Sequence, residues 1–148
     1  AEPFASAQAI NIHFLERFAG DFGEKMHLDV PADIDKSLAD NRVAVVGSGP
    51  AGLCCAGELA RRGVDVTIFE SLHKPGGVLR YGIPPFRLPR DVLDFEINYV
   101  KKFGVKIVPN YIIGKTKMCE DLFKEGFHAI FLGVGAGVPS FLKPDVGL

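Results

Sequence analysis

Three glycines stand directly after a short apolar run, at a spacing typical of a phosphate-binding turn. Gly47, Gly49 and Gly52 follow Val43–Val46, a β-branched run of the kind found in strands buried on both faces. The first glycine permits a tight turn, the second lets backbone approach a pyrophosphate, and the third lets helix and strand pack closely. Free N–H groups and the positive end of a following helix favour an anion there. The motif therefore predicts a binding site for a diphosphate.

An acidic residue at the right distance adds a sugar-binding group to this motif. Glu70 closes a second apolar run, Val66–Phe69, and lies 18 residues beyond Gly52. At the end of the second strand, a carboxylate is placed to accept hydrogen bonds from the ribose hydroxyls of an adenine dinucleotide, and it would repel the 2′-phosphate of NADP. The alternative is a chance glycine turn with an ordinary surface glutamate, which leaves the order of these features unexplained.

These residues need a parallel sheet to position them. A helix predicted over 53–62 joins the two apolar runs into a βαβ unit, which almost always crosses over right-handed. Two further strands are predicted over 105–108 and 129–132, after helices that begin at Asp91 as N-cap and near residue 120. Strands that alternate with helices predict an α/β fold, here a Rossmann-like domain with a parallel sheet.

The first 41 residues are predicted to form a helical arm and a connector. Apolar residues fall at helical spacing at Ile10, Phe14, Leu15 and Phe18. We expect this helix to stop at Gly20, and we expect a surface connector over 21–41 with at most a helical turn at 35–38. The chain therefore divides into an arm over 1–41 and the first part of a dinucleotide-binding domain over 42–148.

FAD and NAD(P) share the same kind of glycine turn, so the choice between them depends on the segment after Glu70. A glycine pair, Gly76 and Gly77, begins six residues later and allows backbone to lie against an extended cofactor. The segment 71–90 is rich in glycine and proline, so no long helix can form there. An NAD-dependent dehydrogenase, the first alternative, would leave this segment unexplained.

The run Lys74–Pro89, KPGGVLRYGIPPFRLP, resembles the small (beta) subunit family of glutamate synthase. The same flavin module occurs in dihydropyrimidine dehydrogenase and in some NADPH-dependent ferredoxin oxidoreductases. The resemblance extends from about Ile10 to Gly137 and is densest from Val43 to Pro89. It implies FAD in this domain and NADPH in a second domain that lies outside this chain. It also implies electron transfer from NADPH through FAD to iron–sulfur clusters and a partner, such as a glutamate synthase large subunit.

The same resemblance implies cofactor-binding roles at individual positions. These are Gly47, Ser48, Gly49, Pro50, Ala51, Gly52, Glu70, Ser71, Gly77, Val78, Leu79, Arg87, Ile113, Gly133 and Gly135. Residues 47–52 would hold the pyrophosphate, Glu70 the adenosine ribose, and residues 77–79 the path toward the flavin ring. Ile113 would flank the adenine, and the chain would pass the cofactor again at 133–135. Arg87 would contact the cofactor, with a salt-bridging surface arginine as the alternative.

Two departures from the family pattern limit what this chain can do. The relatives hold iron–sulfur clusters with cysteines ahead of a helix like 10–18, whereas the first cysteine here is Cys54. Clusters need thiolates in groups, so we expect neither a cluster nor another metal in this chain. No NADPH-type glycine motif follows before Leu148. We therefore expect a piece of a larger NAD(P)H-dependent flavin oxidoreductase, inactive alone and without an assignable catalytic residue; a non-catalytic nucleotide-binding fragment is the second alternative.

Composition excludes several other classes of function. The 17 basic and 18 acidic residues give a net charge of −1 without a basic stripe, which argues against nucleic-acid binding. No apolar run reaches the length of about 18 residues that a membrane span needs, and we expect no retained signal peptide. Three cysteines without regular spacing suit a reducing compartment, so we expect a cytoplasmic protein, with an organelle left open.

Overall fold

The computed structural model describes residues 10–26 and 36–137, in two units that divide at Pro31. The described residues of the first unit, 10–26, include the helix α1 (Ile12–Lys25), whose N-cap Asn11 accepts a hydrogen bond from the Phe14 N–H. The predicted stop at Gly20 is wrong, because α1 continues to Lys25. A glycine inside a helix costs only about 0.5–1 kcal/mol. An ion pair between Arg17 and Asp21, with 2.8 Å between Nε and Oδ1, spans the turn that contains Gly20.

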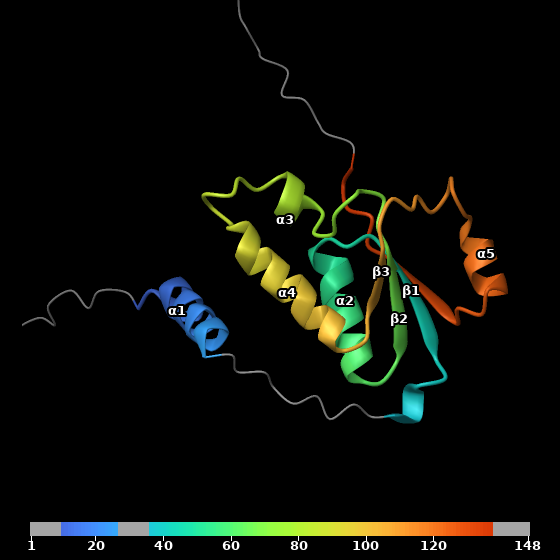
Figure 1. The fold of residues 1–148 in the computed structure, drawn as a ribbon, viewed down its shortest axis with the longest axis horizontal. Coiled ribbons are helices and arrows are strands. Elements are labelled where there is room, and N and C mark those ends of the chain that lie inside the picture. Colours follow the sequence, from blue (N-terminus) through green and yellow to red (C-terminus); the bar gives the residue numbers. More distant parts are fainter. Residues whose placement is uncertain (1–9, 27–35, 138–148) are drawn as a thin grey trace, which may run out of the picture. The chain divides into compact units, whose positions relative to one another are not determined.

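The second unit is built on a parallel sheet with the strand order β3-β2-β1-β4 (Figure 1). Its strands are β1 (Arg42–Val46), β2 (Asp65–Phe69), β3 (Lys106–Val108) and β4 (Ala129–Leu132). In the centre of the sheet Val45 is in register with Ile68 on one side and Phe131 on the other. The parallel α/β sheet predicted from the alternation of strands and helices is thereby confirmed.

The helices of this unit are η1 (Lys36–Leu38, a 3-10 turn), α2 (Pro50–Arg61), α3 (Val78–Tyr81), α4 (Arg90–Lys102) and α5 (Cys119–Lys124). The elements β1, α2 and β2 form the predicted βαβ unit. Asp91 is not the N-cap of α4, because the helix begins at Arg90 and Pro89 occupies the N-cap position, two residues earlier than expected. Asp91 lies in the first turn instead, where a carboxylate still favours the positive end of the helix.

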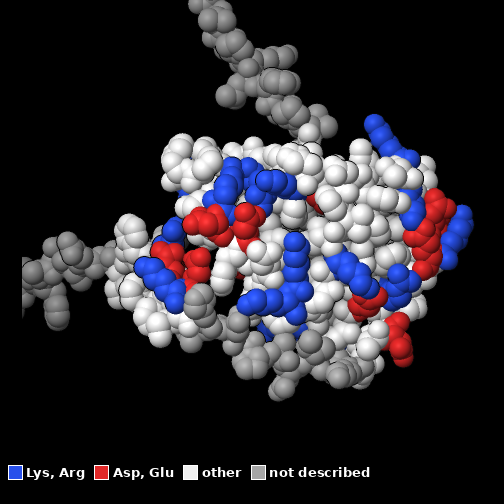
Figure 2. Space-filling model, viewed as in Figure 1, with Lys and Arg blue, Asp and Glu red and all other residues white. Residues whose placement is uncertain are grey.

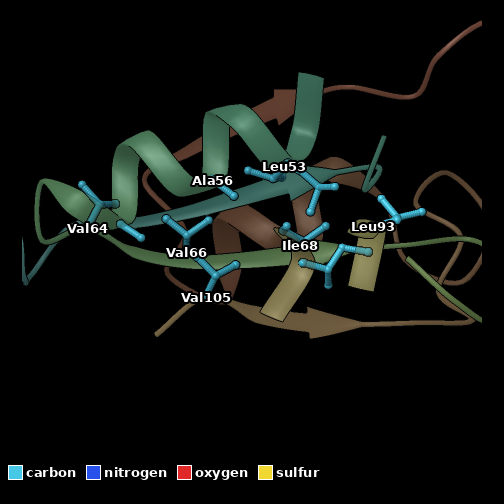
Figure 3. Close-up of a cluster of buried hydrophobic side chains, with 10 residues drawn as sticks. Leu53, Ala56, Val64, Val66, Ile68, Leu93 and Val105 are labelled. Carbon is cyan, nitrogen blue, oxygen red and sulfur yellow. The ribbon is translucent and has the colours of Figure 1, made fainter. Parts of the chain in front are cut away.

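Apolar side chains pack on both faces of the sheet. On one face, covered by α2 and α4, the core contains Leu53 and Ala56 of α2 together with Ile68 of β2 (Figure 3). On the other face a smaller cluster joins Phe69 to Leu122 of α5. Neighbouring residues of β2 thus enter opposite clusters, because side chains alternate across a strand. Burial on both faces explains why the strands read as continuous apolar runs.

The strand β4 lies at one edge of the sheet, and among the described residues no strand pairs with its outer side. Its sequence, Ala-Ile-Phe-Leu, is apolar on both faces, yet Phe131 is 37% exposed and Leu132 is 61% exposed. This composition is typical of an internal strand, and here it occupies an edge position.

The surface carries charges of both signs. On the face shown in Figure 2, acidic and basic side chains lie next to one another in several clusters, with uncharged surface between the clusters. Among the helices that the structure describes, none combines the length and the apolar character required to cross a bilayer.

The packing at the start of α2 makes opposite predictions for two glycines of the same helix. A methyl group on Gly52 would lie under 3.0 Å from the Gly47 carbonyl oxygen, whereas one on Gly57 would meet only Val100 Cγ2, at 3.7 Å. We expect Gly52→Ala to lower the free energy of unfolding by about 2 kcal/mol or more through overpacking. We expect Gly57→Ala to raise it by up to about 1 kcal/mol through helix propensity. Urea denaturation of both variants measures this; equal effects would contradict the packing described.

Candidate functional site

Three segments meet at the carboxyl ends of β1, β2 and β4: the glycine loop, the glycine-pair loop and the residues around Gly133. The glycine loop, residues 47–52, follows β1, and the glycine-pair loop, residues 71–77, follows β2. The Gly76 N–H donates to the Ser48 carbonyl oxygen at 3.1 Å, which fastens the second loop to the first. A methyl group on Gly47 would lie under 3.0 Å from the carbonyl oxygen of Gly133, just after β4. Ligands of open α/β sheets bind at this edge.

Within the glycine loop, two glycines serve the fold and one faces open space. Gly47 has a φ of +97° and donates its N–H to the Phe69 carbonyl oxygen at 2.8 Å. As noted above, no methyl group fits on Gly52. A methyl group on Gly49 would meet no atom within 4 Å. Gly49 is thus the position of this loop where a ligand has room to approach the backbone.

The electrostatics of this open position suit an anion. Gly49 is the N-cap of α2, and it provides no side-chain hydrogen bond to the helix. The first N–H groups of a helix have no partner inside it, and they carry the positive end of the helix dipole. Pro50 occupies the first turn, which contains no acidic residue. The residues present therefore fit the diphosphate of a dinucleotide.

Glu70 is buried between the two loops, with 4% of its surface exposed. One carboxylate oxygen, Oε2, accepts hydrogen bonds from the Ser48 N–H at 2.9 Å and from the Ser48 hydroxyl. The other, Oε1, accepts from the Leu72 N–H at 2.8 Å and from the Ser71 hydroxyl at 3.2 Å. The carboxylate that the motif assigns to a ribose thus accepts hydrogen bonds from the first residues of both loops.

These donors keep Glu70 ionised. Burial alone raises the pKa of its carboxyl group, but the hydrogen bond from the Ser48 hydroxyl, followed by those from Leu72, the Ser48 backbone and Ser71, lowers it further than burial raises it. The net pKa lies below the ordinary value, so the group is a carboxylate at neutral pH. An ionised carboxylate accepts hydrogen bonds only, which matches four partners that all donate.

Several other predicted residues line the same region. Ser71 is exposed beside Glu70. Gly77 is the N-cap of α3, and a methyl group on it would lie 2.9 Å from Gly49 Cα. Val78 is exposed, whereas Leu79 packs against the core under α2 and α4. The structure therefore brings the glycine loop, Glu70, the glycine pair and Gly133 together.

Three predicted residues are not brought against the glycine loop by the described contacts. Arg87 is exposed, and among the described residues it has no ion-pair partner, which leaves its salt-bridging alternative without support. Ile113 packs against the cluster that contains Phe69. Gly135, with a φ of +68°, lies exposed beyond β4. The cofactor roles of these residues stay predictions.

Two arginines that the motifs did not single out hold the glycine-pair segment in place. Arg90 donates from Nη1 to the Leu79 carbonyl oxygen at 2.7 Å and from Nη2 to that of Ile83 at 2.9 Å. Arg80 donates from Nε to the Pro75 carbonyl oxygen at 2.6 Å and pairs with Asp94. Carbonyl groups in irregular backbone need such donors. The only sequence signal was the presence of arginines in a glycine- and proline-rich segment.

Metal binding has no structural support in the described part of the chain. Residues 10–26 and 36–137 contain no group of three or more His, Cys, Asp or Glu side chains that could hold an ion.

Comparison with known proteins agrees with this geometry. A family model described as "NAD(P)-binding Rossmann-like domain" matches residues 45–106. The chain is 43% identical over 140 residues to the NAD-dependent dihydropyrimidine dehydrogenase subunit PreT of Escherichia coli O157:H7, which covers 93% of this chain and 34% of PreT. It is 42% identical over 130 residues to the NADPH-Fe(3+) oxidoreductase subunit beta of Geobacter sulfurreducens, covering 86% of this chain and 19% of that protein. The chain thus spans about a third of the first relative's length and about a fifth of the second's.

A solved structure shows the same fold. FprA of Mycobacterium tuberculosis, in complex with NADPH, superposes with a TM-score of 0.62 at 22% identity, over 70% of this chain and 24% of FprA. The structural similarity shows the Rossmann-like fold, and the sequence matches show the homology. The chain is therefore a homologue of NAD(P)-dependent oxidoreductase subunits, which confirms the resemblance to this group of oxidoreductases that the sequence carries from about Ile10 to Gly137.

Proposed function

We propose that this chain is the FAD-binding part of an NAD(P)H-dependent oxidoreductase. The observation that carries the proposal is the packing of two glycine loops around one open position. Gly49 faces open space at the start of α2, and Gly77 lies so close behind it that a methyl group there would be 2.9 Å from Gly49 Cα. A diphosphate bound at α2 would therefore lie beside the backbone of both loops.

The second loop supports a flavin dinucleotide over a nicotinamide dinucleotide. A βαβ unit alone suffices to hold a diphosphate and a ribose. Here the chain adds a lining beyond that unit, which continues from Gly77 into α3 and is fixed by Arg80 and Arg90. A pre-formed surface of this length suits an extended cofactor, and the resemblance of Lys74–Pro89 to flavin modules points the same way.

The residues of this chain would bind and orient the cofactor. The N–H groups at the start of α2 would bind the diphosphate. The ionised Glu70 would accept a hydrogen bond from the ribose in place of the 3.2 Å bond from the exposed Ser71 hydroxyl. When bound, FAD supplies hydride and single-electron chemistry that no side chain offers. None of the described residues is assigned as a general acid or base.

In the full-length protein we place the NADPH site and the iron–sulfur clusters outside this chain. Electrons would pass from NADPH through FAD to clusters and then to an electron-accepting subunit, a glutamate synthase large subunit being one candidate. The names of both relatives describe subunits, which supports a partner. The cysteines Cys54, Cys55 and Cys119 are free thiols, which suits the cytoplasm.

One observation favours a second candidate. The matching family model is described as NAD(P)-binding, which would suit a dehydrogenase that holds NAD at the same glycine loop. A nucleotide-binding fragment without turnover is the remaining alternative.

The role of Gly49 predicts a variant that loses the cofactor and keeps the fold. A methyl group from Gly49→Ala finds open space in the structure, so we expect little change in melting temperature. The same methyl group would occupy the place of the diphosphate, and we expect FAD affinity to fall about tenfold or more, which is about 1.4 kcal/mol. Quenching of flavin fluorescence measures the affinity, with Gly57→Ala on the same helix as control. Unchanged affinity in Gly49→Ala would place the diphosphate elsewhere.

The division of labour predicts a difference between the full-length protein and this chain. We expect the full-length protein to be yellow when purified and to lose its flavin absorbance on addition of NADPH. We expect the 148-residue chain to oxidise NADPH slowly or not at all. Absorbance scans and NADPH turnover assays measure both. Efficient turnover of NADPH by the chain alone would contradict our proposal that the NADPH site lies outside it. A colourless full-length protein that cannot take up flavin would favour an NAD-dependent dehydrogenase.

A further inference from the structure

Ser48, the second residue of the glycine loop, joins both loops through one buried side chain. Its exposed surface is zero, and its hydroxyl donates to Glu70 Oε2. The same hydroxyl oxygen accepts a hydrogen bond from the Gly76 N–H at 3.0 Å. One side chain therefore connects Glu70, directly after β2, with Gly76, which lies 28 residues beyond Ser48 in the sequence.

The direction of these hydrogen bonds makes the connection specific. A serine hydroxyl has one proton to donate and two lone pairs that accept. Because Glu70 is an ionised carboxylate, it accepts the hydrogen bond that the Ser48 hydroxyl donates, and a lone pair of the hydroxyl oxygen accepts from the Gly76 N–H. The side chain is thus held in one orientation by a fixed acceptor on one side and a fixed donor on the other.

We propose that Ser48 is a positioning residue that couples the orientation of the Glu70 carboxylate to the position of the glycine pair. Its buried hydroxyl acts through Glu70 and Gly76, and this role is separate from any contact of the Ser48 backbone with the pyrophosphate. This inference rests on the proposed function for its effect on the cofactor, because Glu70 would hold the ribose and Gly77 would line the path to the flavin. Its effect on the protein without ligand is independent of that function.

Amide hydrogen exchange without ligand tests the coupling. In Ser48→Ala the Gly76 N–H loses the Ser48 hydroxyl as an acceptor and keeps the Ser48 carbonyl oxygen, so we expect this amide to exchange about three- to tenfold faster. Ser71→Ala is the matched control, because the Ser71 hydroxyl donates to the other oxygen of the same carboxylate. We expect it to leave the Gly76 amide unchanged, and we expect Ile68 in β2 to be unchanged in both variants. Equal acceleration in the two variants, or acceleration throughout the sheet, would overturn the coupling.

The pH dependence of stability separates positioning from simple packing. The pKa of Glu70 is lowered on folding, so its contribution to stability is present above its unfolded pKa, about 4.3, and is lost as pH falls through the folded pKa. The Ser48 hydroxyl makes the largest lowering contribution, against the upward effect of burial. We therefore expect the difference in melting temperature between wild type and Ser48→Ala to be largest near pH 7 and to narrow below about pH 4.3. A constant difference at every pH would show a packing effect alone and would overturn the proposal.

A measurement of FAD affinity tests the effect of Ser48 on cofactor binding. It also distinguishes a failure of the proposed function from a failure of the coupling. With FAD as the probe, we expect Ser48→Ala to bind about tenfold more weakly than wild type, with Gly57→Ala as the control. If wild type does not bind FAD, the proposed function is wrong, while the exchange and pH results still decide the coupling. If Ser48→Ala loosens the Gly76 amide and binds FAD as tightly as wild type, the link from Ser48 to the cofactor is overturned.

Discussion

The candidate site depends on backbone packed against backbone at one edge of the sheet. The start of α2, the end of β1 and the segment after β4 come so close that Gly47 and Gly52 admit no methyl group. Gly77 is similarly tight against Gly49 from behind. These contacts hold the glycine loop in place without a ligand, while a methyl group on Gly49 would still meet no atom within 4 Å. The room for a diphosphate is thus a consequence of how the loops support one another.

A buried carboxylate, Glu70, connects the two loops, and this structural role exists without a ligand. Glu70 accepts hydrogen bonds from both loops, and their combined effect keeps it charged despite its burial. The motif describes the same residue as a sugar ligand, and the two roles are compatible in kind because each requires an ionised acceptor. A neutral amide at this position would present donors to neighbours that also donate. The charge that suits a ribose is therefore the charge that holds the loops together.

The sequence predicted those parts of the structure that depend on local patterns. The runs at Val43–Val46 and Val66–Phe69, the glycine motif and Glu70 all lie where the pattern placed them. The expected helix stop at Gly20 was wrong, because neighbouring side chains outweigh the small cost of one glycine. The roles of Ser48 and of the two arginines could not be predicted, because they depend on hydrogen bonds between segments that only the folded chain brings together. Local periodicity carries no information about such contacts.

The open edge of β4 has a consequence for handling the protein. Backbone N–H and C=O groups along an unpaired strand offer a template on which another strand can add, and apolar side chains on both faces favour such addition. In the unit that contains the sheet, taken alone, Phe131 and Leu132 present this combination. If no other segment covers this edge, the described part of the unit therefore favours self-association through strand addition.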